Sequence, residues 1–327
     1  MNDRPLVEAI NRLRGEWAER SGGELNAVPT KWDDLAQAKS IDADLIVFPS
    51  RYLGDLCSRK LLRPVRASVL VDDEFKSADI FPLVRNDLIK WGRETYALPL
   101  GVDPTAIMPS MKSSPAIALL AAAAPHAISN ERLGVLFDVD TMKPRITEPA
   151  FVDALTQLPL SSKESPSKDS LTSEPQVPVL GYNDRLLAVT ASSRNAASAF
   201  KLAEWLALAE TGSQFARVSG DWLPPRRSVA SSSSWYEPTL SAGERSKRST
   251  QVDAALSGER ALVVPRIPGI DAYLAALDTA VKSALDGKSS PAAALQTATD
   301  EWEKITDRLG RDKQRDAYQK HLGISDE

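Results

Sequence analysis

The 327-residue chain contains one cysteine and two histidines, which limits the metal and redox chemistry available to it. A single cysteine, Cys57, cannot form an internal disulfide or a multi-cysteine metal site. It lies on an apolar helical face, and we interpret it as a small buried hydrophobic residue. His126 and His321 have no second candidate ligand nearby in the sequence. We therefore expect no bound metal and no cofactor.

Short catalytic motifs are also missing. The chain has no G-x-S-x-G, no G-x-x-x-x-G-K-[ST], no G-x-G-x-x-G and no H-E-x-x-H. Paired carboxylates for glycoside hydrolysis leave no such signature, because the two residues can lie far apart in the chain. The sequence predicts a protein that is not an enzyme, with a hydrolase as an alternative.

Strong charge and long apolar runs are absent as well. The formal net charge is −4, which gives no sign of nucleic-acid binding. The longest apolar tract, 116–124, is shorter than the roughly 20 residues that span a bilayer. Residues 1–5 lack the basic and apolar regions of a signal peptide. Two interpretations stay open: the chain is trimmed at its start, or the protein never carried such a segment.

The composition is that of an ordinary globular protein. Hydrophobic residues make up 43% and charged residues 26% of the chain. A chain of this length can form two lobes or domains. Residues 161–175 are rich in Ser, Lys, Glu and Pro, which predicts a flexible loop.

The most informative stretch is 177–206. It consists of an apolar run at 177–180, a polar turn, a second apolar run at 186–192 and a helical pattern from 196. The rest of the chain alternates in a similar way. Strands are predicted at 26–28, 44–48, 94–100 and 135–138, and helices at 5–20, 53–58, 116–124, 148–158, 251–256, 270–285, 290–309 and 311–321, with a polar excursion at 228–249.

Four motifs occur in order between about residues 40 and 230. The first combines Asp44–Phe48 with the leucines that follow it, and the second is Tyr96–Gly101. The third runs from Leu187 through Asn195 to Leu206, and the fourth is Gly220–Ser228. Together they resemble the motifs of type II extracellular solute-binding proteins of ABC transporters.

The resemblance implies an α/β fold of two lobes, with mostly parallel sheets flanked by helices and joined by hinge strands. Hinge strands are expected near 98–103 and 181–188, with a further crossing near 223–228. Residues 1–101 and 184–224 would form the first lobe. Residues 102–183 and 225–327 would form the second lobe, whose 102–183 section is shorter than the family pattern.

The implied function is to capture a small solute, such as a sugar or oligosaccharide, in a cleft between the lobes and to deliver it to a membrane ABC permease. The implied location is the periplasm or the outer face of the cytoplasmic membrane, and the implied state is a monomer without nucleic-acid partners. One alternative is a repurposed binding protein that acts as a sensor or scaffold without transport.

Candidate ligand-binding residues come from segments that follow predicted strands or border the expected crossings, because ligands of open α/β sheets bind at strand ends. Aromatic rings with amide and carboxylate groups suit sugars, whereas Arg51, Arg185, Arg226 and Arg227 would suit an anion. Structural alternatives stay open: a surface ion pair for Arg51, a hinge-fixing pair for Asp184 and Arg185, packing for Trp222, and solvated charges for Arg226 and Arg227. The candidates are Ser50, Arg51, Tyr52, Asp103, Tyr182, Asn183, Asp184, Arg185 and Trp222, with Trp235 and Tyr236 as an exposed aromatic pair.

Overall fold

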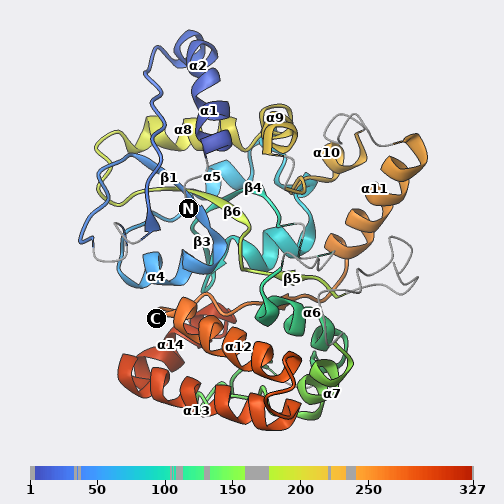
Figure 1. Ribbon diagram of the computed structural model, residues 1–327. Helices are drawn as coiled ribbons and strands as arrows, with labels where there is room; N and C mark the ends of the chain where they lie inside the picture. The colour runs from blue at the N-terminus through green and yellow to red at the C-terminus, as the bar shows by residue number, and fades with distance from the viewer. Residues whose placement is uncertain are drawn as a thin grey trace.

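Buried apolar side chains form two large groups, which we call the first core and the second core (Figure 1). In Figure 1 the first core lies in the upper part of the molecule and the second among the helices at the bottom. The computed structural model describes residues 4–32, 35, 38–103, 105, 107, 113–128, 133–158, 177–219, 222–232 and 241–325. The predicted loop at 161–175 and the pair Trp235 and Tyr236 lie outside these residues.

The first core surrounds a sheet of three strands in the order β1 (Leu45–Pro49), β6 (Arg185–Val189) and β4 (Leu98–Gly101). Both strand pairs are antiparallel, so the prediction of mostly parallel sheets is wrong for this sheet. The reason is the path of the chain: β1 and β4 run toward the junction with the second core, whereas β6 starts there and runs back between them.

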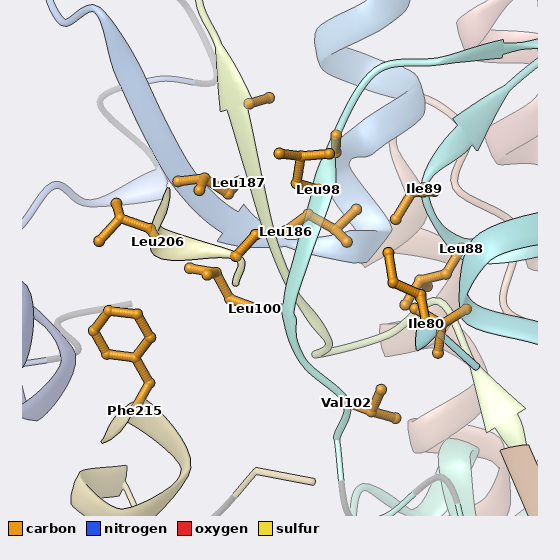
Figure 2. Close-up of a cluster of buried hydrophobic side chains, with 14 of the residues drawn as sticks. Ile80, Leu88, Ile89, Leu98, Leu100, Val102, Leu186, Leu187, Leu206 and Phe215 are labelled. Carbon is orange, nitrogen blue, oxygen red and sulfur yellow. The ribbon is translucent and has the colours of Figure 1, made fainter. Parts of the chain in front are cut away.

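Leucines of β4 and β6 provide much of the first core. Figure 2 shows them where the two strands run side by side, with Ile80, Leu88 and Ile89 on one side and Leu206 and Phe215 on the other. All of these side chains are buried. The surrounding elements are α1 (Arg4–Arg12), α2 (Arg14–Ser21), η1 (Ser50–Tyr52), α4 (Leu53–Ser58), α5 (Ala67–Leu70), η2 (Ser77–Asp79), η3 (Val84–Leu88), β2 (Lys90–Trp91), β3 (Glu94–Thr95), α8 (Ala196–Leu206), α9 (Ala209–Ser219), α10 (Arg227–Ser231) and α11 (Ala242–Leu256).

Several local predictions for this part are wrong. The helix expected at 5–20 is two helices that meet at Leu13, and residues 26–28 form no strand. The strand expected at 94–100 is divided into β3 and β4. The excursion expected at 228–249 contains most of α10 and the first half of α11, whose start is fixed by a capping box between Ser241 and Glu244.

The second core is mainly helical and follows the predictions closely. It is built from α6 (Pro115–Ala127), α7 (Pro149–Gln157), α12 (Ile270–Leu285), α13 (Pro291–Leu309) and α14 (Arg311–His321), beside the parallel pair β5 (Val179–Leu180) and β7 (Leu262–Val263). Tyr273, Trp302 and Tyr318, predicted as core residues, are buried around Phe137 with ring centroids 4.9 to 5.5 Å from its ring. The segment 135–138 forms a single bridge, from Phe137 to Pro144, and no strand.

Helices α10 and α11 pack with the first core, through Val229, Val252 and Leu256 among others. The chain therefore passes to the second core between Leu256 and Val264, whereas the sequence placed all of 225–327 in the second lobe.

The two cores also meet at a buried seam between α4, η3, α14 and the segment that precedes α12. Its central residue is Arg266, which is 2% exposed. Its guanidinium donates hydrogen bonds to the Leu88 carbonyl and, over 3.3 Å, to His321 Nδ1. The Arg266 carbonyl lies directly against Gly54 of α4. Side chain and backbone of one residue thus hold the seam together.

The seam makes stability depend on pH through His321. Burial, followed by the charge of Arg266, lowers the pKa of His321 well below 6.5. The unfolded chain therefore binds a proton that the folded chain excludes, and folding is favoured fully above pH 6.5. Below pH 6.5 the free energy of unfolding should fall with a slope from this residue that approaches about 1.4 kcal/mol per pH unit near pH 5.

Urea unfolding at pH 8 to 5 measures this slope. His321→Gln should flatten it, and His126→Gln, at an exposed position on α6, should not. An unchanged slope in His321→Gln would contradict the assignment.

Candidate functional site

Two segments that link the cores meet beside the three-stranded sheet: the end of β4 with Val102 and Asp103, and the loop 181–184 before β6. The segment 222–226, which connects α9 to α10 within the first core and was predicted as a further crossing, lies beside them. Val102 and Leu223 exchange two backbone hydrogen bonds of 2.9 and 2.8 Å. Arg185 at the start of β6 pairs with Pro49 of β1 and Gly101 of β4. These contacts gather the predicted site residues in one place.

Asp184 connects these segments. It is 1% exposed, and its Oδ2 accepts hydrogen bonds from Ser50 Oγ (2.8 Å) and the Gly181 N–H (2.7 Å). Its Oδ1 accepts one from the Asp103 N–H (3.0 Å). Burial, and next the charge of Asp103, raise the pKa of Asp184, and the three hydrogen bonds oppose that shift. In this arrangement Asp184 and Ser50 join the crossings to each other.

Gly181 makes the close approach at this loop possible. Its φ is +85°, and an added Cβ would lie 2.8 Å from Val263 Cγ1 and 2.9 Å from the Val264 carbonyl. Only glycine tolerates both conditions, so it positions the Asn183–Asp184 turn against β7.

Arg51 lies at the surface of the same junction and contacts both cores. Its Nε donates to Asp271 Oδ1 over 2.9 Å, and its other nitrogens donate to the Tyr182 carbonyl, Asn183 Oδ1 and the Tyr52 hydroxyl. Its guanidinium carbon lies 4.3 Å from the ring centroid of Tyr52 and 5.0 Å from that of Tyr182. The surface ion pair considered from the sequence thus exists, and it bridges η1 and α12.

Tyr52 completes the bridge from the first core. Its hydroxyl donates to Asp271 Oδ2 over 2.6 Å, so both oxygens of that carboxylate are held. Burial and the bond to Asp271 raise the Tyr52 pKa. Its ring stacks on Trp32 with centroids 3.5 Å apart and planes 6° apart. The stack fixes the orientation of the Tyr52 hydroxyl.

Sequence reasoning missed Trp32 and Asp271 as site residues. Trp32 lies more than 15 residues from any candidate segment, and Asp271 falls in the first turn of a predicted helix, where an acidic residue is favoured for the helix itself. Neither position carried a signal that could separate a site residue from a structural one.

Arg185 and Trp222 form another cation–π contact. The guanidinium carbon lies 5.0 Å from the Trp222 ring centroid, and both side chains are buried. Trp222 therefore packs at the crossing, as the structural alternative expected. Asp103 is also buried, and its Oδ1 accepts hydrogen bonds from the backbone and hydroxyl of Thr105.

Arg226 was expected to be a solvated charge, and this is wrong. It is 3% exposed, its Nε donates to the Ala207 carbonyl over 2.8 Å, and its guanidinium lies over Phe75. Asp79 is 3.7 Å away. Arg226 thus anchors the segment between α9 and α10 to η2, away from the Arg51 cluster.

The described residues hold no group of three His, Cys, Asp or Glu that could bind a metal ion. No described helix is both long and apolar enough to cross a bilayer.

No protein-family model and no curated protein sequence matches this chain. Among solved structures it is similar to the sugar-binding protein MalE from Xanthomonas citri, with a TM-score of 0.68 and 16% identity over 93% of this chain and 95% of that one. A cyclo/maltodextrin-binding protein complexed with maltotetraose gives 0.65 and 15% over 94% and 96%. The GacH receptor of Streptomyces glaucescens, solved with acarbose, gives 0.63 and 15% over 94% and 96%.

The structural similarity establishes the fold, but sequence identities this low do not identify the ligand. The resemblance found in the sequence motifs is confirmed at that level: the chain has the two-lobe fold of the type II solute-binding proteins.

Proposed function

We propose that this protein binds a sugar or oligosaccharide between its two lobes and delivers it to a membrane ABC permease on the outer side of the cytoplasmic membrane. The observation that carries the proposal is the cluster at the crossings. There an aromatic surface (Trp32, Tyr52, Tyr182) lies beside an amide, a guanidinium and a carboxylate, in a fold whose solved relatives include sugar-binding proteins.

The chemistry of the cluster suits a sugar ring. Planar aromatic faces pack against the C–H faces of sugars, and convergent amide and carboxylate groups bond their hydroxyls. Tyr182 and Asn183 are partly exposed, and Asp271 is 51% exposed on its side chain. These three groups are therefore accessible to a solute, whereas Asp184 and Ser50 are not.

Binding would act through the relative position of the lobes. The Arg51–Asp271 and Tyr52–Asp271 contacts already join the first core to the N-terminus of α12. A solute that contacts both sides of this junction adds interactions to the closed arrangement alone, and so shifts the population toward it.

Thermal unfolding against a panel of mono- and oligosaccharides, amino acids and organic anions tests the proposal. A solute at 100 times its dissociation constant should add about 2.7 kcal/mol to the free energy of unfolding. Chromatography of the recovered solute separates binding from hydrolysis, because a binding protein returns it unchanged. A stabilising sugar that is returned intact supports the proposal, and a panel without any effect contradicts it.

Tyr182→Ala should weaken binding of the stabilising sugar about 10- to 100-fold, because an aromatic contact surface and its packing against Arg51 are lost. Tyr182→Phe keeps the ring and serves as the control, with an expected loss below about tenfold. Isothermal calorimetry measures both. Equal affinities of the alanine variant and the parent would remove Tyr182 from the site.

A further inference from the structure

Carboxylates outnumber cations around Tyr182. Asp103 follows β4, and Asp271 and Asp278 lie seven residues apart on one face of α12. Asp278 Oδ1 accepts hydrogen bonds from Ser114 Oγ (3.0 Å) and the Ala116 N–H (2.7 Å), and Asp103 is held by Thr105. These donors are neutral, so they fix the carboxylates in place without neutralising their charges.

The cations nearby compensate this charge only in part. Arg51 pairs with Asp271. Among the described residues whose charge acts on Tyr182, three are carboxylates (Asp103, Asp271, Asp278) and one is a guanidinium (Arg51), which leaves two net negative charges there.

The pKa of Tyr182 responds to the negative charge of these carboxylates. Burial raises its pKa, Arg51 opposes that shift, and the charges of Asp278, Asp271 and Asp103 add to it. The phenol that would contact the solute therefore lies in the electrostatic field of all three carboxylates.

We infer that the crossover site selects hydroxyl-rich solutes by charge: an amino sugar carrying an ammonium group binds more tightly than its neutral parent, and a uronic acid binds more weakly. This inference rests on the proposed function. It also favours a sugar over an anionic ligand, the two alternatives that the arginines left open in the sequence analysis. Arg51 is occupied by Asp271 and two tyrosine rings, and Arg226 is buried elsewhere.

The size of the effect follows from Coulomb's law. A ligand charge held ~6 Å from two unit charges, at the dielectric constant of water, changes affinity roughly tenfold. Salt screens such a contribution, so the preference should shrink in about 0.5 M NaCl.

Calorimetry on the full chain at low salt, with glucosamine, glucose and glucuronate and with their β-1,4-linked disaccharides, tests the order. The expected result is about tenfold tighter binding at each step from acid to neutral to amine. Binding without this order, or tightest binding of the acid, overturns the charge selection and leaves the sugar-binding function standing. Binding of none of these sugars, together with no stabilising sugar in the broader panel, overturns both.

Asp271→Asn gives the residue-level test. It removes one of the two net charges, so the ratio of amine to neutral affinity, measured within the same variant, should fall about threefold. Asp286→Asn is the matched control, because it removes the same charge from the other end of α12, where Asp286 pairs with Lys288. An equal change in both variants would show a general effect of net charge and overturn the assignment to this site.

Discussion

Gly54→Ala should destabilise the protein by about 3 kcal/mol or more, although Gly54 lies in a helix. A Cβ at this position would lie 1.6 Å from the Arg266 carbonyl oxygen and 2.5 Å from the Trp91 ring. Neither can move freely, because Arg266 is hydrogen-bonded to η3 and α14 and Trp91 is buried. Overpacking of this kind typically costs 1–3 kcal/mol, and a rigid backbone neighbour raises the cost.

Gly212→Ala is the control for this prediction. Gly212 also lies in a helix, α9, but a Cβ there would have nothing within 4 Å. Alanine should therefore stabilise the protein by roughly 0.5–1 kcal/mol through helix propensity alone. Urea unfolding of both variants measures the two effects. A Gly54→Ala protein as stable as the parent would mean that the cores do not meet at this seam.

Asp184→Ala should lower the free energy of unfolding by about 3–5 kcal/mol. The substitution removes the acceptor for Ser50 Oγ and for the N–H groups of Gly181 and Asp103, all of them buried. The serine hydroxyl can rotate to another partner, but the two backbone donors cannot, and each unsatisfied buried donor costs about 1–3 kcal/mol. The loss also releases the chain crossings from one another.

Asp184→Asn separates the hydrogen bonds from the packing. The asparagine oxygen can accept from Ser50 and Gly181, whereas its NH₂ group faces the Asp103 N–H, so one donor stays unsatisfied. The expected loss is about 1–3 kcal/mol, smaller than for alanine. Chemical unfolding of both variants gives the order, and an alanine variant within about 1 kcal/mol of the parent would show that Asp184 does not join the crossings.

Helices with a strong amphipathic pattern could be predicted from the sequence. The predicted bounds of α4, α12 and α14 agree with the structure at both ends. In these helices the apolar face and the end signals are local, so the sequence contains all the necessary information. The break at Leu13 between α1 and α2 was missed, because the apolar periodicity continues through it.

The structure brings most of the candidate residues together in one region, but the sequence could not separate their roles. Arg51, Tyr182 and Asn183 gather where the crossings were expected, and Asp184 and Arg185 are buried among them. Whether a polar residue beside a strand end faces solvent or ties two segments together depends on contacts with residues more than 80 positions away, such as those of Asp184 with Ser50 and Asp103.

By itself the sequence determined the helices with clear local signals, such as α4, α12 and α14, the absence of short catalytic motifs, and the motifs that resemble a two-lobe fold. Only the tertiary structure decided that β6 runs antiparallel between β1 and β4, that Trp32 and Asp271 join the site, and that Arg226 is buried. The physical reason is the distance along the chain over which each interaction acts. Periodicity and capping act within a few residues, whereas strand direction, burial and charge balance at the junction arise from segments that meet only after the chain has crossed between the two cores.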